Sequence, residues 1–346
     1  MITLIKFRFK SARPDLLDIK KFEDFCAQNS TWNKVEGPLL IAPVKISSRF
    51  YSLLHIIFRP LLKNYKRSGA IVSLGLPYFI YLFSKTFPDF SFNYDLRVLW
   101  TWDVWQPKYD EIEKLVRRSK INLLLLSSYQ ATDYFRKLSI PNCEVHWVHE
   151  TIDTDEYQTK PWNERSVHIL SFGRSYSKYH NKIIEGCDLN NINYKFHERK
   201  DGKDVAIQGV KPSSLQFSTW PEFKRGLSDA QICICFPKAL THPEVAGEVS
   251  TVTLRYLQAM ASKCLLIGSA PLDMKYLFDY NPVIEVDWND PVGQLVNILE
   301  NPEPYFDLIE RNYETVCKKF HYRNGLEMID QLTNDSLSRI KKNVLV

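Results

Sequence analysis

From residue 70 onward, short apolar runs alternate with stretches of helical periodicity. The runs "AIVSLGL", "LRVLWTW", "INLLLLSS" and "CEVHWVH" predict strands, and "PKYDEIEKLVRRSK" and "YQATDYFRKLSI" predict the helices between them. Strands that alternate with helices in this way are typical of a parallel sheet in an α/β protein. The pattern therefore predicts an α/β fold.

The alternation stops at a polar, proline-containing stretch, "DTDEYQTKPWNERS", and starts again at "VHILSFG". Because 346 residues are too many for one ordinary core, we interpret this stretch as a linker between two domains. The predicted boundaries are 1–153 for the first domain, 154–166 for the linker, 167–330 for the second domain and 331–346 for a C-terminal helix or tail. Ligands of such folds bind at the carboxyl ends of the strands, so two sheets predict a cleft between the domains.

Charge and cysteine content exclude several classes of protein. The formal net charge of +5, from 45 Lys+Arg against 40 Asp+Glu, is well short of that of a nucleic-acid-binding protein. The seven cysteines are scattered and lack zinc spacing, which indicates free thiols in a reducing compartment. The start "MITLIKFRFK" has no signal-peptide core, and the apolar run at 70–83 is short for a span of about 20 residues. We therefore expect a cytoplasmic protein.

The first 69 residues leave two interpretations open. The stretch "KISSRFYSLLHIIFRPLLKNYKRSG" mixes Lys and Arg with aromatic and aliphatic residues at nearly helical spacing. It is either a basic, aromatic surface that rests on an anionic membrane or an amphipathic helix that covers the first sheet.

The stretch "GEVSTVTLRYLQAMASKCLLIG" predicts a helix from about Thr251 to Ser262 followed by a buried strand. Ser250 or Thr251 is expected to cap the first turn. Helical spacing places Thr251, Arg255 and Gln258 on one side. The free N–H groups and the dipole at the helix start favour a phosphate, whereas the alternative is a capped core helix with Arg255 in solvent.

Three other loops follow predicted strands and carry polar residues. In "SFGRSYSKYHNK", Arg174 and Lys178 are placed to bind a phosphate, unless the loop is only a solvated basic loop. The loop "FPKALTHPEVAGE" suits hydroxyl recognition or proton transfer, the alternative being a simple turn. Its candidate residues are Lys238, His242, Glu244 and Glu248. Asp103, after a strand of the first domain, is either a general base or hydroxyl acceptor or the cap of the next helix.

Two further observations concern a histidine and the absence of known nucleotide-binding and hydrolase motifs. His321 follows the end of a predicted helix, where a cation satisfies the dipole, and we interpret it as structural. The sequence has no GxGxxG, Walker A or GxSxG pattern, which argues against dinucleotide-binding enzymes, NTPases and α/β-hydrolases.

In order and spacing, these segments resemble the GT-B glycosyltransferases, in particular the GT4-type group and its spore-protein-like relatives. The resemblance covers residues 70–330 and rests on the segments "RVLWTWDVW", "NLLLLSSYQATDYFRKL", "VHWVHETIDTDEY", "ILSFGRSYSK", "LSDAQICICFPK" and "LRYLQAMASKCLLIGS". It implies two Rossmann-like domains whose parallel sheets face an interdomain cleft. Trp102 stands where the family has His, and Gln258 stands where it has the second Glu of an acid pair.

The resemblance also implies roles for individual residues. Arg174 and Lys178 would bind the donor diphosphate, and Gln258 would bind the ribose. Glu248, or Glu244, would supply the first acid of the pair, and Asp103 would act with Glu248 in catalysis. The remaining donor-binding candidates are Lys238, His242, Ser250, Thr251, Val252 and Arg255.

The expected activity is transfer of a sugar from a nucleotide-activated donor to a saccharide or lipid-linked saccharide acceptor. By resemblance, the reaction retains anomeric configuration, needs no metal or other cofactor and serves surface polysaccharide biosynthesis. The expected partners are the donor, the acceptor and, peripherally, an anionic membrane, with no nucleic acid. Two alternatives stay open: a nucleotide-sugar epimerase or hydrolase on the same fold, and a catalytically silent scaffold module.

Overall fold

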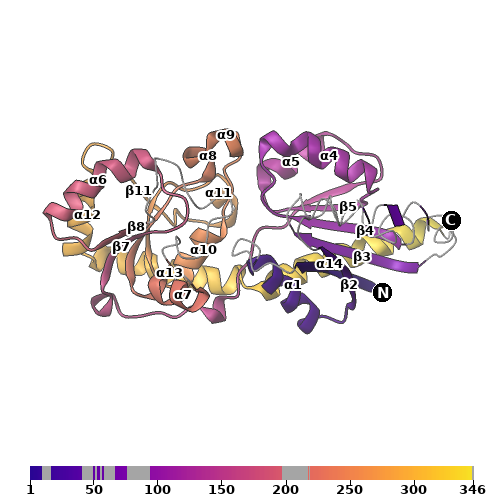
Figure 1. Cartoon of the computed structure of the whole chain (residues 1–346), viewed down its shortest axis with the longest axis horizontal. Coiled ribbons are helices and arrows are strands. Elements are labelled where there is room, and N and C mark those ends of the chain that lie inside the picture. Colours follow the sequence, from indigo (N-terminus) through magenta and orange to yellow (C-terminus); the bar gives the residue numbers. More distant parts are fainter. Residues whose placement is uncertain are drawn as a thin grey trace. The chain divides into compact units, whose positions relative to one another are not determined.

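The computed structural model describes residues 1–9, 17–40, 50, 53–54, 57, 67–75, 94–196, 217 and 219–344. The chain divides into two compact units (Figure 1), one formed by Met1–Glu150 together with Tyr322–Val346 and the other by Thr151–His321. Most of the basic, aromatic stretch at 45–69 lies outside the described residues, and so does the membrane interpretation that rests on it.

The first unit is built on a parallel sheet with strand order β2-β1-β3-β4-β5-β6. Its strands are β1 (Ile2–Phe9), β2 (Asn33–Leu40), β3 (Arg67–Gly75), β4 (Tyr94–Thr101), β5 (Leu123–Leu126) and β6 (Glu144–Trp147). Its helices are α1 (Leu17–Asn29), the 3-10 turn η3 (Gln106–Lys108), α4 (Tyr109–Arg118), α5 (Tyr129–Lys137) and α14 (Tyr322–Val344). All four leucines of β5 are buried, as expected for a strand covered on both faces.

The second unit has a parallel sheet with strand order β11-β10-β9-β7-β8. Its strands are β7 (Val167–Ser171), β8 (Tyr194–Phe196), β9 (Ala230–Cys235), β10 (Leu265–Gly268) and β11 (Ile284–Glu285). Its longer helices are α6 (Ser177–Leu189), α7 (Trp220–Ser228), α10 (Leu254–Ala261), α12 (Pro291–Glu300) and α13 (Phe306–Lys319). Its short turns are η4 (Thr154–Glu156), η5 (Trp162–Glu164), α8 (Lys238–Thr241), α9 (Pro243–Ala246), α11 (Met274–Leu277) and η8 (Glu303–Tyr305).

The apolar residues of the second sheet pack on both of its faces. Leu170, Cys233 and Leu266 belong to one buried cluster, with side chains of α7, α10 and α13. Their neighbours Ile169 and Ile232 belong to the other, with side chains of α6 and α12. Successive strand residues point to opposite faces, so unbroken apolar runs such as "ICICF" (232–236) contribute to both buried clusters.

Both sheets have the connectivity of a doubly wound fold. The first strand of each unit lies between the second and the third, and later strands add on the side of the third. The strand order therefore reverses beside the first strand, between β1 and β3 in one sheet and between β7 and β9 in the other. The predicted α/β class with two Rossmann-like parallel-sheet domains is confirmed. Within the described residues, no helix is both long and apolar enough to cross a membrane.

The units differ from the predicted boundaries at the C-terminus. Residues 322–330 were expected in the second domain, but they begin α14, which belongs to the first unit. The ring of Tyr322 packs at 5.2 Å from that of Phe22 on α1, and the indole N–H of Trp32 donates to Asp330 Oδ1 at 2.6 Å. These partners lie some 300 residues away in the sequence, so helical periodicity alone does not identify them.

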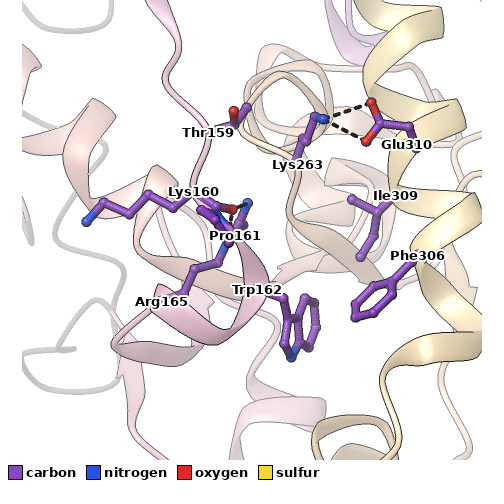
Figure 2. A pocket seen from close by; sticks show the side chains of 9 residues that line it. All are labelled: Thr159, Lys160, Pro161, Trp162, Arg165, Lys263, Phe306, Ile309 and Glu310. Atoms are coloured by element: carbon purple, nitrogen blue, oxygen red, sulfur yellow. Dashed lines mark hydrogen bonds and ion pairs between the residues drawn. The ribbon is translucent and has the colours of Figure 1, made fainter.

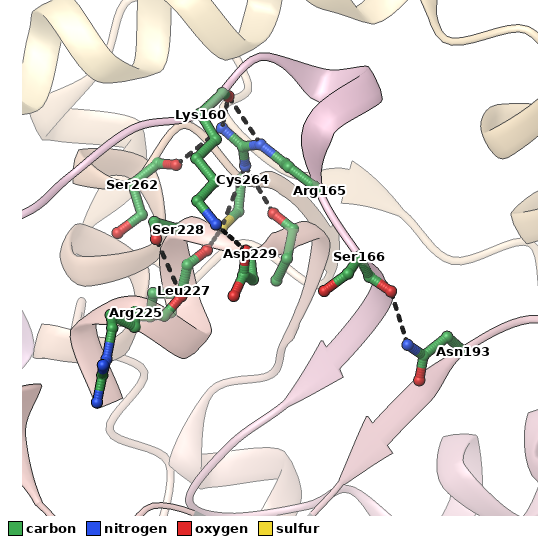
Figure 3. A network of polar contacts seen from close by, with 11 residues as sticks. Lys160, Arg165, Ser166, Asn193, Arg225, Leu227, Ser228, Asp229, Ser262 and Cys264 are labelled. Carbon is green, nitrogen blue, oxygen red and sulfur yellow. Dashed lines mark hydrogen bonds and ion pairs between the residues drawn. The ribbon is translucent and has the colours of Figure 1, made fainter. Parts of the chain in front are cut away.

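The predicted linker also forms part of the second unit, because a buried arginine ties it to the sheet (Figure 3). Arg165 is only 6% exposed, and its guanidinium donates to the carbonyls of Lys160 (2.7 and 3.0 Å), Ala230 (2.6 Å) and Ser262 (3.1 Å). Lys160 also forms an ion pair with Asp229. These contacts cover the amino end of the sheet. The carboxyl end is the end at which ligands of such folds bind.

Candidate functional site

The candidate site lies at the carboxyl end of the second sheet, where the strand order reverses between β7 and β9. In doubly wound folds this reversal leaves a crevice, because the loops after the two strands run in opposite directions. The β7 loop runs through Phe172, Gly173 and Arg174 into α6, and the β9 segment runs through α8 and α9 into α10. Most of the predicted donor-binding residues lie on these two segments.

The first long helices after these two strands, α6 and α10, begin without a side-chain cap. Neither Tyr176 before α6 nor Thr253 before α10 accepts a hydrogen bond from its helix. Helices α7 and α12, which follow the outer strands β8 and β11, are capped by Thr219 and Asp290. Uncapped first turns leave N–H groups and the positive end of the dipole for an anion. The two uncapped starts flank the switch point.

The predicted start and cap of α10 are wrong. The helix begins at Leu254 rather than Thr251, and neither Ser250 nor Thr251 caps it. The Thr251 hydroxyl donates to Asp273 Oδ2 at 2.6 Å, and Ser250 Oγ accepts from the N–H of Leu272 at 3.2 Å. Asp273 is only 1% exposed and needs a donor, so it takes the hydroxyl that would otherwise cap the helix. Val252 is buried beside them.

Arg255 is not a solvent-exposed residue, as one alternative expected, but is 8% exposed. Its Nη1 donates to the carbonyl of Arg174 at 2.6 Å, and its guanidinium lies 5.6 Å from the ring centre of Phe172. Gly173 has φ +67°, and a Cβ there would lie 2.7 Å from Nη2 of Arg255. Arg255 therefore positions the β7–α6 turn against α10, and the left-handed φ of Gly173 favours glycine at this point of the turn.

The cations of the β7–α6 loop lack a carboxylate partner among the described residues. The Nε of Arg174 is buried and makes no hydrogen bond within the described part of the chain. Lys178, in the first turn of α6, lies 4.9 Å from the ring centre of Trp288. A buried donor without an acceptor is costly, so an anionic ligand at this position would relieve that cost.

The other candidates of the second unit lie on the segment from the end of β9 to α10. Lys238 begins α8, and Nδ1 of His242 lies 3.0 Å from Oγ1 of Thr241. Glu244 and Glu248 are exposed on either side of the turn at Gly247, whose φ is +59°. Gln258 is 6% exposed on α10, and its side-chain amide has no hydrogen-bond partner within the part of the chain that the structure describes. That amide is available to a ligand.

Asp103 is the one candidate in the first unit. It follows β4 with φ +52°, a left-handed backbone that is uncommon outside glycine, and its side chain is exposed. The alternative that it caps the next helix is wrong, since the residue at the start of η3 is Trp105 and no side chain caps it. Trp102 is buried with its ring 5.0 Å from that of Trp100, so it is a core residue.

A cavity of about 410 Å³ lies at the opposite, amino end of the second sheet (Figure 2). Its lining residues are Thr159, Lys160, Pro161, Trp162, Arg165, Lys263, Phe306, Ile309 and Glu310. Its charged groups already have partners, as in the pair of Lys263 and Glu310 at 2.6 Å. Because the cavity lies at the other end of the sheet, it is separate from the switch point. It was not predicted from the sequence.

Comparison with known proteins identifies the fold. No protein-family model matches the sequence, and no curated protein matches it. Among solved structures, sucrose-phosphate synthase from Thermosynechococcus elongatus is similar over 98% of this chain and 99% of its own (TM-score 0.61, 13% identity). HepE from Anabaena, solved with UDP-glucose, is similar over 98% and 99% (TM-score 0.59, 11% identity). A glycosyltransferase from Rickettsia africae is similar over 99% of both chains (TM-score 0.51, 11% identity). The chain therefore has the fold of the GT-B glycosyltransferases.

Proposed function

We propose that this protein is a glycosyltransferase that transfers a sugar from a nucleotide-activated donor to a saccharide or lipid-linked saccharide acceptor. The observation that carries the proposal is the cation Arg174, with its unpartnered buried Nε, between two uncapped helix starts at the switch point of the second sheet. This combination suits a diphosphate, which offers several anionic oxygens to N–H donors. HepE, which has the same fold, binds UDP-glucose and supports the choice of donor.

In the proposed reaction, the second unit stabilises the leaving nucleoside diphosphate. Arg174, Lys178 and the N–H groups at the starts of α6 and α10 would face the charge that develops as the glycosidic bond breaks. Because Arg255 and Gly173 hold the β7–α6 turn in place, these donors need little rearrangement during the reaction. The amide of Gln258 can both donate to and accept from ribose hydroxyls. Lys238, His242, Glu244, Ser250, Thr251 and Val252 complete the proposed donor site.

The finer parts of the proposal rest on the family resemblance. Asp103 is proposed as the acceptor-side acid or base, supported by its left-handed backbone, and Glu248 as its partner on the donor side. We further propose a retaining outcome, chemistry that needs no metal, a role in surface polysaccharide synthesis, and a cytoplasmic location with peripheral membrane contact. Each of these follows from analogy, because a fold alone does not determine the chemistry that it supports.

Isothermal titration with UDP, GDP, ADP, CDP and dTDP tests the donor site. One of them should bind the wild-type chain, and Arg174→Gln should weaken that binding at least tenfold, because a buried charge-assisted contact is lost. Arg225→Gln is the matched control, since Arg225 is an exposed arginine on α7 and its loss should leave the affinity unchanged. If no nucleotide binds, or if both variants bind equally well, the proposed donor site is wrong.

The two alternative functions give different results in a turnover assay. A transferase consumes its donor faster when an acceptor is present, whereas an epimerase or hydrolase does not depend on the acceptor. A silent module would neither turn over a donor nor be stabilised by nucleotide, since a ligand that binds only the folded state must raise its stability.

A further inference from the structure

The second unit contains a cluster of three metal-ligating side chains that is distinct from the candidate donor site. Asp153 and Asp155 lie at the start of the unit, and His321 is its last residue. One potential ligand atom from each of the three lies within 4.8 Å of the others. We propose that this cluster is a binding site for a divalent cation of the zinc class. This proposal does not rest on the proposed transferase activity.

The distances within the cluster are longer than those of direct hydrogen bonds between these side chains and leave room for a shared ion. The Nε2 of His321 lies 3.6 Å from Oδ1 of Asp153 and 3.6 Å from Oδ2 of Asp155. This separation is too long for an N–H···O hydrogen bond, whose upper limit is about 3.2 Å. Tetrahedral zinc, with ligands at about 2.0–2.1 Å, separates its ligand atoms by about 3.3–3.4 Å. The two separations from His321 are therefore within a few tenths of an ångström of the zinc value, and all three ligand atoms lie within 4.8 Å of one another.

Burial and ligand type point to the same class of ion. The His321 side chain is 11% exposed and that of Asp153 is 29% exposed, so two ligands are largely held by the protein. Asp155 is 85% exposed and leaves a fourth position open to water. One imidazole and two carboxylates suit zinc and its neighbours in the first row, whereas magnesium and calcium prefer oxygen ligands alone.

The cluster lies where the chain enters and leaves the second unit. The first unit ends at Glu150 and resumes at Tyr322, so the chain crosses between the units at these two places. There, the N–H of Ile152 donates to the carbonyl of Phe320 at 2.9 Å, and Ile152 forms a parallel bridge with His321. An ion held by Asp153, Asp155 and His321 would link the entering segment to the leaving one. The sequence interpretation of His321 as a residue that only satisfies a helix end misses these partners.

Titration of the chelator-treated full-length chain with Zn²⁺ tests the proposal. We expect one ion per chain and at least a tenfold loss of affinity in Asp155→Asn, a variant that folds normally because Asp155 is mostly exposed. His321→Gln should lose affinity in the same way. Asp188→Asn, which changes an exposed aspartate on α6, is the matched control and should bind like wild type. Absence of zinc binding, or equal binding by Asp155→Asn and wild type, would overturn the proposal.

The cysteines need a separate control, because thiolates also bind zinc. Cys317 is the cysteine near Thr154 and Asp155, but its thiol is not among the ligand atoms that lie together in the cluster. Cys317→Ser should therefore keep the wild-type affinity. The bound ion can also be replaced by Co²⁺, whose spectrum should show nitrogen and oxygen ligands without a thiolate charge-transfer band. Loss of binding in Cys317→Ser, or such a band, would contradict the assigned ligand set.

Discussion

At the scale of single residues, the geometry of the proposed donor site depends on Gly173. Its left-handed backbone costs an L-residue about 1–2 kcal/mol, and a Cβ at this position would lie 2.7 Å from Arg255 Nη2. Gly173→Ala should therefore destabilise the second unit by more than the backbone cost alone. Hydrogen exchange of β9 and α10 amides in the full-length chain measures this loss, because it reports on one unit at a time.

A double-mutant cycle separates the two costs of this substitution. In an Arg255→Ala background the clash is absent, so Gly173→Ala should cost only the backbone part, and the two changes should couple by about 0.5–3 kcal/mol. An equal cost in both backgrounds would mean that Arg255 moves away freely and does not position the turn.

Site residues that follow the end of a strand could be predicted from the sequence. Contacts that depend on a residue far away in the sequence could not. Arg174 lies at the carboxyl edge, as expected, because an apolar strand ends just before it. The cap at Thr251 was predicted wrongly because Asp273, 22 residues further along, takes its hydroxyl. Local periodicity contains no signal for such a pair.

At the scale of elements, apolar runs predicted the strands after residue 70, but the pattern of the first 69 residues did not predict their secondary structure. Strand β1, "ITLIKFRF", includes Lys6, whose ammonium pairs with Asp24 on α1 at 2.5 Å. A charge inside a strand weakens the apolar pattern, and the partner that neutralises it is 18 residues away. Helix α14 was predicted as a helix for part of its length, but its place in the first unit depends on distant partners.

One ionic contact attaches α14 to β6 and predicts a pH dependence. Burial raises the pKa of Glu144, but hydrogen bonds from Arg339 and Ser336 and the charge of Arg339 outweigh it, so the pKa lies below its ordinary value. A lowered folded-state pKa gives stability that is complete above the unfolded-state value, about 4.3, and is lost as pH falls through the folded-state value. Arg339→Gln should remove this contribution.

The expected loss at neutral pH is about 1 kcal/mol or less, because both side chains are about half exposed. Hydrogen exchange of β6 and α14 amides, compared at pH 7 and near pH 4, should show the difference from wild type shrinking at the lower pH. Lys341→Gln, an exposed change on the same helix, is the control. A difference of the same size at both pH values would show that Arg339 acts through packing rather than charge.

At the scale of the whole molecule, chain order and unit membership do not coincide. Helix α13 belongs to the second unit, whereas α14, separated from it by two residues, belongs to the first. The C-terminal helix completes a core that begins with β1 and α1, as the contact of Tyr322 with Phe22 shows. The first unit therefore cannot be complete until the whole second unit has been synthesised, which a division of the sequence into consecutive domains does not predict.

This organisation predicts that the same substitution, Ile to Ala, destabilises a different unit depending on which side of residue 321 it lies. Ile329 on α14 is fully buried in the first unit, and Ile309 on α13 is 6% exposed in the second. Replacing either with alanine removes the same atoms and should cost about 2–5 kcal/mol, or roughly a 30-fold or greater loss of amide protection. Ile329→Ala should lower protection in β4 and leave β9 unchanged, whereas Ile309→Ala should lower it in β9 and leave β4 unchanged. If Ile329→Ala instead weakened β9, α14 would belong energetically to the second unit and the predicted consecutive domains would be the better description.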